Sequence, residues 1–202
     1  MYESGFVVSL FLMYLLLWKW KQVSQRRQTG IDPEVFDKAT SPLQQYMAKF
    51  SKFMTVAIIL LIVFHATGVQ YYSLFTRFPW LDYFQVDLIG FVVGLIGLTI
   101  CGVAQKTMGN SWRVGIDEIN RPELVTTGIF KYIRNPTYLG LMLLIIGVWL
   151  IWPTWTIGTF ALFFIFFLEI QVRCEEEYLL KIHGDRYRDY CSKTGRYFFR
   201  IK

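Results

Sequence analysis

Two polar clusters in the chain carry residue types that can do chemistry. In the first, Arg134-Asn135-Pro136 stands directly before a long apolar run; in the second, the run Arg173-Cys-Glu-Glu-Glu177 follows a later one. A proline in the first turn of a helix lies beside free amide groups, which favour a negatively charged group. Glutamates beside a lipid surface suit a ligand with positive charge. The clusters together predict a polar pocket where membrane and cytosol meet.

The acidic cluster also has a plainer interpretation. Three consecutive glutamates on a helix point in three directions, so they cannot all serve one site. Glu169 and Arg173 are spaced for an ordinary ion pair on a solvated helix end. The pocket is favoured because a tight turn between the two preceding apolar runs brings this helix end near the level of Asn135 and Tyr138.

The elements that must position these clusters are membrane helices. Of the 202 residues, 54% are hydrophobic and 18% charged, whereas a soluble domain carries about 25% charged residues. Since about 20 apolar residues cross a bilayer, we expect an all-α integral membrane protein with about five transmembrane helices. These cover residues 5–20, 53–72, 86–103, 136–152 and 155–168.

Several features refine this arrangement. Only Pro153 and Thr154 separate the last two spans, which predicts a tight helical hairpin. The fifth helix continues to about residue 182 and stops at Gly184. Gly90 and Gly94 form a small-xxx-small face, which predicts close packing against a neighbouring helix. The alternative, a dinucleotide-binding fingerprint, is excluded because the glycine spacing does not fit it.

Between the third and fourth spans lies a polar connecting segment. Its residues Val125, Ile129, Tyr132 and Ile133 are spaced for a short helix with one apolar side. We treat the chain as a single membrane domain. Residues 1–104 hold three spans and an interfacial loop, and residues 105–202 hold the catalytic core.

Charge predicts the orientation. Twenty of the 21 lysines and arginines fall in residues 19–52, in 103–137 and after 171. The positive-inside rule then places the amino terminus outside and the carboxy terminus in the cytosol, in a bacterial inner membrane or the endoplasmic reticulum. The first span lacks a basic leader and a small-residue cleavage site, so we interpret it as a retained helix.

Composition excludes several classes of protein. Three cysteines do not make a disulfide scaffold, and 18 Phe, 12 Tyr and 7 Trp exclude disorder. The basic residues flank apolar runs, so no nucleic-acid partner is expected. His65 and His183 are the only histidines, which excludes a multi-histidine metal or haem centre. No metal is expected, and His65 is interpreted as a neutral, hydrogen-bonded residue.

The two clusters lie within paired motifs that resemble the isoprenylcysteine carboxyl methyltransferase family, part of a superfamily that includes membrane phospholipid methyltransferases. The motifs are Thr127-Gly128-x-Phe-x-Tyr-x-Arg134-Asn135-Pro136-x-Tyr138-Leu-Gly140 and Glu175-Glu176-x-x-Leu-Leu-x-x-x-Gly184-x-x-Tyr187-x-x-Tyr190. The resemblance covers roughly residues 105 to 200. It implies an S-adenosylmethionine-dependent enzyme with a cytosolic cofactor pocket, built from residues 105–137 and the carboxy-terminal tail.

The resemblance also implies site residues. The implied cofactor contacts are Pro122, Glu123, Leu124, Val125, Phe130, Asn135, Pro136, Thr137, Tyr138, Glu175 and Glu176. Arg134, Tyr138 and Arg173 are the candidates for the substrate side. Arg134 has an alternative role in snorkelling to lipid phosphate, and Tyr138 in anchoring the interface.

Two positions depart from the family. Asn135 stands where the family usually has histidine, and it cannot titrate. The family's substrate-side arginine falls on Gln171. Arg173, two residues later, points about 200° away around a helix.

These observations predict methylation of a lipophilic acceptor, a small molecule or a lipidated protein taken from the bilayer. A carboxylate is favoured because it needs no strong base, and the segment offers none. The alternatives are phospholipid N-methylation or thiol methylation, an NADPH-dependent membrane reductase and a non-catalytic membrane scaffold. The acidic run argues against binding the extra phosphate of NADPH.

Overall fold

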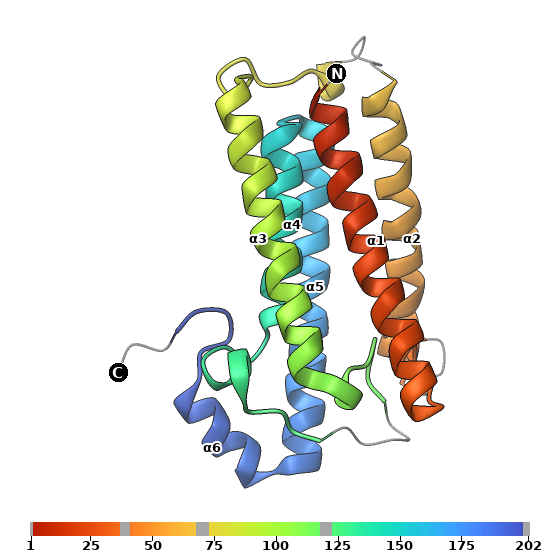
Figure 1. Cartoon of the computed structure of the whole chain (residues 1–202), viewed down its shortest axis with the longest axis vertical. Helices are drawn as coiled ribbons and strands as arrows, with labels where there is room; N and C mark the ends of the chain where they lie inside the picture. Colours follow the sequence, from red (N-terminus) through yellow and green to blue (C-terminus); the bar gives the residue numbers. More distant parts are fainter. Residues whose placement is uncertain (1, 37–40, 68–72, 118–122, 200–202) are drawn as a thin grey trace.

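The protein is a helical bundle, described here from a computed structural model for residues 2–36, 41–67, 73–117 and 123–199. Its helices are α1 (Tyr2–Thr29), α2 (Pro42–Ala66), α3 (Phe84–Met108), α4 (Pro136–Ile151), α5 (Trp155–His183) and α6 (Asp185–Lys193), with the short 3-10 helices η2 (Ser73–Phe75), η3 (Gly109–Ser111) and η4 (Gly128–Lys131). Figure 1 shows α1 to α5 side by side along the long axis and α6 at one end. In the described ranges, β structure is limited to two isolated bridges.

Four helices, α1, α2, α3 and α5, are long and apolar enough to cross a membrane. The predicted fourth span is the apolar helix α4, which has only 16 residues. At 1.5 Å per residue it is about 24 Å long, less than the roughly 30 Å of a hydrocarbon core. Prolines delimit it, because Pro136 opens the helix and Pro153 follows its last turn.

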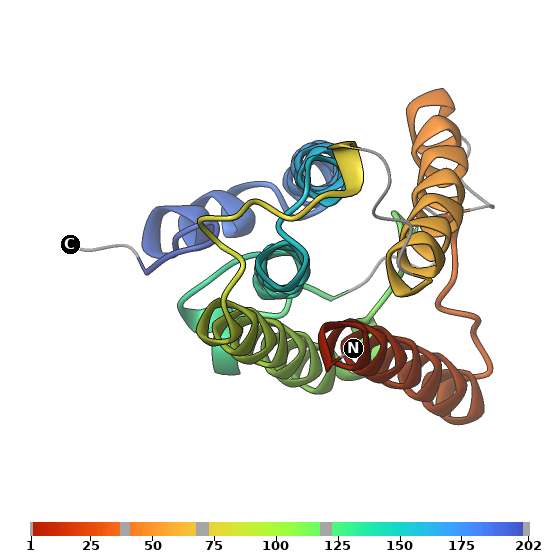
Figure 2. The same ribbon diagram turned by 90° about the horizontal axis from the view of Figure 1, so that it is seen from above.

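Helix α4 lies inside the bundle, against α3 and α5 (Figure 2). Glycines bring α3 and α4 together, since a methyl group built on Gly90 would lie 2.7 Å from the carbonyl oxygen of Gly147. Gly94 leaves room for Leu10 of α1 in the same way. The predicted packing role of Gly90 and Gly94 is confirmed.

The predicted hairpin is also confirmed. The hydroxyl of Thr154 accepts a hydrogen bond from the backbone N–H of Ile157 at 3.3 Å and so caps α5. Helix α5 ends where Gly184 adopts a positive φ of 53°, a conformation open to glycine. Its charged carboxy-terminal half therefore extends beyond the apolar part and carries α6.

Other boundaries differ from prediction. The short helix expected over Val125, Ile129, Tyr132 and Ile133 is wrong, because only the single 3-10 turn η4 forms there. Gly128 takes a positive φ of 57°, and the chain then turns to pair Ile133 with Gly195. Helix α1 is longer than expected, and α2 starts earlier, at Pro42, and ends at Ala66; the predicted end of that span lies outside the described residues.

A largely buried ionic cluster lies at the end of the bundle opposite α6. The Arg77 guanidinium lies 3.1 Å from a Glu3 carboxylate oxygen, 2.9 Å from one of Asp82 and 2.5 Å from one of Asp87. Asp87 is fully buried at the start of α3, whereas Glu3 belongs to α1. We call these four residues the Arg77 cluster.

His65 of α2 also lies near this end. Its Nε2 is 2.9 Å from the hydroxyl oxygen of Thr156, and its ring stacks on Trp152. This agrees with the prediction of a hydrogen-bonded structural residue.

Candidate active site

A polar cavity of about 220 Å³ opens at the end of the bundle that carries α6. It forms where the segment before α4 meets the carboxy-terminal half of α5. Its lining includes Trp112, Arg113, Asp117, Glu123, Leu124, Val125, Phe130, Arg134, Asn135, Pro136, Thr137, Tyr138, Gln171, Glu175, Tyr178, Leu179, Tyr187 and Tyr190. Side chains from two distant parts of the chain therefore share one cavity.

Most predicted site residues lie in this lining. Among the described residues, only Glu176 and Arg173 of the predicted set are outside it. Pro122 lies outside the described residues. Direct contacts join the two motifs: the Asn135 side-chain amide donates to Glu176 at 2.9 Å, and the Tyr138 hydroxyl donates to a Glu175 carboxylate oxygen.

Glu175 accepts hydrogen bonds from one side chain of α4 and from one of its own helix, α5. Besides Tyr138 of α4, the side-chain amide of Gln171 donates to it at 3.3 Å. The same Gln171 nitrogen lies 3.4 Å from the side-chain oxygen of Gln44, in the first turn of α2. A carboxylate fixed by donors on one oxygen can receive a cationic or hydroxyl group on the other.

Arg173 does not join the cavity. Its side chain is 65% exposed and forms an ion pair with Glu169 at 2.9 Å, one helical turn away. Gln171, only 2% exposed, lines the cavity instead. The 200° separation of the two positions on the helix is the physical reason, and the placement of Arg173 on the substrate side is corrected accordingly.

Glu176 lies behind the cavity wall and holds three of the neighbouring side chains by hydrogen bonds. It accepts hydrogen bonds from Asn135, from the Arg134 Nε at 3.2 Å and from Arg196 Nη2 at 2.7 Å. Arg134 also donates to the carbonyl oxygens of Cys191 and Thr194. Its side chain is only 13% exposed, so the alternative role in snorkelling to lipid is wrong.

The carboxy-terminal segment closes this wall. The backbone N–H of Arg134 donates to the Gly195 carbonyl at 2.9 Å, and that of Asn135 to the Arg196 carbonyl at 3.1 Å. The hydrogen bonds from Arg196 to Glu176 raise the pKa of this guanidinium further. Burial and a hydrogen bond to Glu169 raise the pKa of Tyr197. Both groups therefore keep their protons at neutral pH and act as donors.

Tyrosines complete the floor. Tyr190 donates to the Phe130 carbonyl at 2.6 Å, and burial raises the pKa of Tyr190 to about 12. Tyr178 donates to the Asp117 carbonyl at 2.7 Å. The sequence interpretation missed Tyr178, although its spacing of three from Glu175 was a usable signal. No sequence signal pointed to Asp117.

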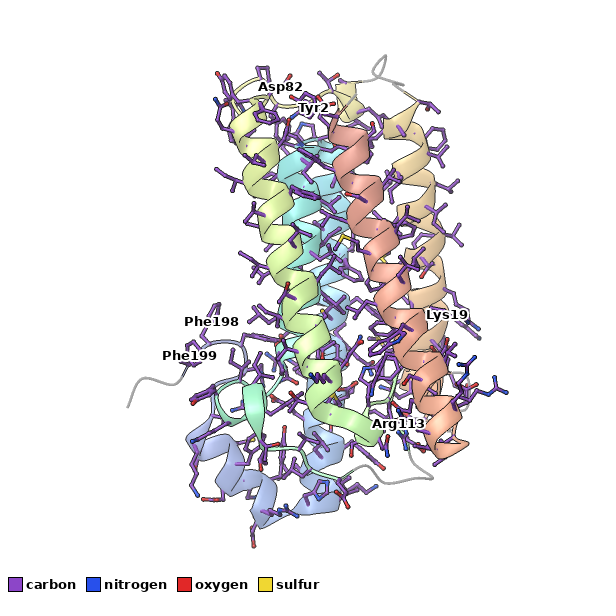
Figure 3. All side chains as sticks on the ribbon, viewed as in Figure 1. Tyr2, Lys19, Asp82, Arg113, Phe198 and Phe199 are labelled. Atoms are coloured by element: carbon purple, nitrogen blue, oxygen red, sulfur yellow. The ribbon has the colours of Figure 1, made fainter. Side chains whose placement is uncertain are left out.

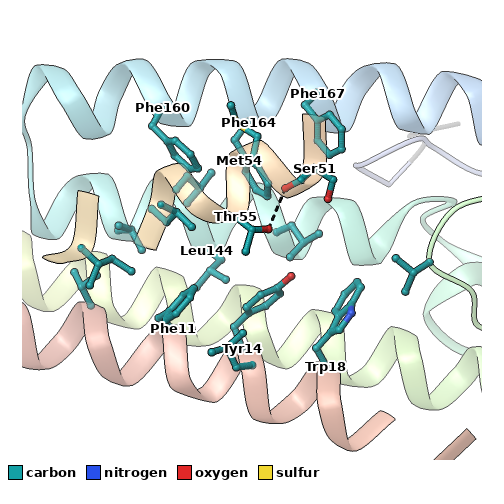
Figure 4. Close-up of a pocket in the computed structure, with 18 of the residues that line it drawn as sticks. Phe11, Tyr14, Trp18, Ser51, Met54, Thr55, Leu144, Phe160, Phe164 and Phe167 are labelled. Atoms are coloured by element: carbon teal, nitrogen blue, oxygen red, sulfur yellow. Dashed lines mark hydrogen bonds between the residues drawn. The ribbon is translucent and has the colours of Figure 1, made fainter. Parts of the chain in front are cut away.

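A second, apolar cavity of about 510 Å³ lies between α1, α2, α4 and α5. Figure 4 shows Phe11, Tyr14 and Trp18 of α1 facing Met54, Phe160 and Phe164 across it. Eight residues line both cavities: Tyr14, Trp18, Phe36, Ser51, Val114, Leu141, Phe164 and Phe167. The apolar cavity thus extends from the depth of the bundle and shares part of its wall with the polar one.

Comparisons with known proteins agree with this architecture. The profile of the phospholipid methyltransferase family matches residues 86–186. The chain is 31% identical over 134 residues to a protein-S-isoprenylcysteine O-methyltransferase of Dictyostelium discoideum, covering 65% of this chain and 55% of the relative. It also resembles a solved eukaryotic intramembrane Ras methyltransferase, isoprenylcysteine carboxyl methyltransferase, with a TM-score of 0.60 and 25% identity over 73% of this chain and 52% of that one.

The fold and the paired motifs therefore define an integral membrane protein of the methyltransferase type. The chain belongs to the phospholipid methyltransferase family, and the predicted likeness to the isoprenylcysteine carboxyl methyltransferases within it is confirmed. It spans about half the length of the relatives it matches.

Proposed function

We propose that the protein is an S-adenosylmethionine-dependent methyltransferase that methylates a lipophilic acceptor, with the carboxylate of an isoprenylcysteine as the acceptor. The observation that carries this proposal is the wall shared by the two cavities. A polar cavity open to water and an apolar cavity between membrane helices meet at Tyr14, Ser51 and Phe167. A soluble methyl donor and a membrane-bound acceptor can therefore approach each other from opposite sides.

The polar cavity suits the proposed cofactor in its chemistry. Leu124, Phe130 and Tyr187 offer an apolar and aromatic wall for an adenine ring. Glu175 offers a fixed carboxylate for an amino group or ribose hydroxyls. Thr137 lines this cavity, and its buried hydroxyl oxygen makes no hydrogen bond to the described residues.

The start of α4 suits the negative end of the same cofactor. The first amides of a helix lack intrahelical acceptors, so those of Thr137 and Tyr138 favour a carboxylate. The Asn135 side-chain amide is instead bound to Glu176, so we assign Asn135 to shaping this turn. Glu176 and Arg134 are then positioning residues.

The apolar cavity suits the chain of the acceptor. Its lining runs along α1 from Val7 to Lys19, which spans about 18 Å at the rise of an α-helix. One leaflet of the hydrocarbon core is about 15 Å thick. A single isoprenyl chain can therefore lie in the cavity parallel to the lipids, with its polar head at the polar cavity.

Alignment is the main task of these residues. The cofactor supplies an electrophilic methyl group on a sulfonium, and a carboxylate acceptor is already nucleophilic. Tyr138, held by Glu175, lines the cavity and fixes the approach of the acceptor. The apolar lining of Phe164 and Phe167 excludes water from the line of transfer.

Binding and product analysis test this proposal. Calorimetric titration of the purified protein with S-adenosylhomocysteine should show binding at one site per chain. Folded protein that gives no heat would favour the non-catalytic scaffold. Labelled methyl groups should pass from S-adenosylmethionine to an isoprenylated cysteine analogue and be released by mild alkali, as esters are. A label that is not released as methanol and stays on the headgroup amine of a phospholipid would favour phospholipid N-methylation, and the matching family is named for phospholipid methylation.

A further inference from the structure

Three exposed aromatic rings gather beside the carboxy-terminal segment. Phe198 is 75% exposed, Phe199 67% and Tyr132 51%. The rings of Tyr132 and Phe199 meet edge to face with centroids 5.7 Å apart. The Lys131 ammonium lies 5.9 Å from the centre of the Tyr132 ring. We call Tyr132, Phe198 and Phe199 the aromatic patch.

The patch lies at about the height where the apolar part of α1 gives way to charged residues. Lys19 is the first cation after the apolar part of α1, beside the exposed Trp20. Figure 3 shows Phe198 and Phe199 at about the height of Lys19, on the opposite side of the bundle. Aromatic and basic residues together are typical of the interface between lipid and water.

The patch also continues a lipid-facing surface. Val92, Ile96 and Val103 are exposed along α3. Thr107, one turn beyond Val103, packs against Gly128 of η4, and Tyr132 directly follows that turn. The exposed face of α3 thus leads through Thr107 and η4 to Tyr132 of the patch, and Lys131 adds a positive charge that suits anionic lipid phosphates.

The same segment forms the wall of the polar cavity. Phe198 stands two residues after Arg196, whose backbone carbonyl accepts from Asn135 and whose guanidinium binds Glu176. Glu176 in turn holds the Asn135 side chain. An interaction that holds the aromatic patch in place therefore also stabilises the position of the turn at the start of α4.

We propose that the aromatic patch inserts into the headgroup region of the adjacent leaflet and that this lipid contact holds the carboxy-terminal segment closed against the polar cavity. The first half of this proposal stands on the exposed rings and their height. The second half rests on the proposed function, since it predicts that cofactor affinity depends on the patch.

A spin label tests the insertion directly. The full chain carries Cys174→Ala and Cys191→Ala, and the buried Cys101 is kept. A nitroxide is attached at Phe199→Cys, and the protein is placed in phosphatidylcholine–phosphatidylglycerol nanodiscs. Collisions with oxygen should exceed those with a water-soluble nickel chelate. The matched control is Asp185→Cys on α6, whose side chain is 94% exposed and which should favour nickel. Equal nickel access at both positions would overturn the insertion.

Ligand binding tests the second half. The double variant Phe198→Ser/Phe199→Ser should bind S-adenosylhomocysteine about fivefold more weakly in the same nanodiscs, a loss of about 1 kcal/mol. The control Tyr46→Ser removes a 70% exposed aromatic from α2 and should leave affinity unchanged. Unchanged affinity in the double variant would overturn the link to the cavity. A wild-type protein that binds no ligand would contradict the proposed function, while the spin label would still report the patch.

Discussion

Two arginine-centred clusters at opposite ends of the bundle differ in what surrounds them. The Arg77 cluster joins α1 to α3, and none of its residues lines either cavity. At the other end, Arg134 and Arg196 hold Glu176, and Glu176 holds Asn135 on the wall of the polar cavity. A buried ion pair is therefore not itself a sign of function. The neighbouring polar cavity, lined by residues of both motifs, distinguishes the end that we propose to be functional.

Breaking the Arg77 cluster should affect stability alone. Arg77→Met leaves the fully buried Asp87 without its cationic partner, which we expect to cost about 3–5 kcal/mol in the free energy of unfolding. Chemical unfolding in detergent measures this loss. The control Asp82→Asn, at a 51% exposed carboxylate, should cost no more than about 1 kcal/mol. A weakened affinity for S-adenosylhomocysteine in folded Arg77→Met would contradict the purely structural role.

At the functional end, Glu175→Gln should reduce S-adenosylhomocysteine affinity at least about tenfold, because a charge-assisted hydrogen bond becomes a neutral one. Calorimetric titration measures the change, and unfolding of the variant should stay near that of the wild type. Unchanged affinity would reject Glu175 as a ligand contact.

Glu176→Gln should act more weakly, since Glu176 supports the wall from behind. We expect about fivefold weaker binding, which corresponds to about 1 kcal/mol, together with a similar loss of stability. The same titration and an unfolding curve give both values. A loss of affinity greater than that of Glu175→Gln would mean that Glu176 itself faces the ligand.

Arg173→Gln should have the smallest effect. Its exposed ion pair with Glu169 contributes at most about 0.5 kcal/mol, so affinity and methyl transfer should stay within about twofold of the wild type. Gln171→Leu is the matched change on the cavity side of the helix. Gln171→Leu should reduce the rate of methyl transfer more than Arg173→Gln does. A larger loss in Arg173→Gln would instead support a role for Arg173 in the active site.

Much of the architecture could be predicted because membrane helices leave strong local signals. The apolar runs, the Pro153–Thr154 joint and the stop at Gly184 each depend on a few adjacent residues. The meeting of Asn135 with Glu176 followed from the hairpin, because a two-residue joint fixes the direction of the returning helix.

Other features had no local signal. The backbone pairing of residues 134 and 135 with residues 195 and 196 uses main-chain groups that every residue possesses. Gln44 reaches Gln171 across 127 positions of sequence. The failed helix prediction near Ile129 shows a local pattern overruled by a distant contact, since the chain leaves the helical path after Lys131 and pairs Ile133 with Gly195.

The shortness of α4 has a consequence for where the two substrates meet. At its start, the Cys101 thiol of α3 lies 3.4 Å from the Thr137 carbonyl oxygen, whereas α3 continues to Met108, seven residues or about 10 Å further. The start of α4 on the cavity wall therefore lies beside the middle of the last part of α3, about two helical turns before α3 ends. In the proposed reaction, the water-soluble methyl donor binds at a level close to the lipid. The lipophilic acceptor therefore reacts without leaving its leaflet.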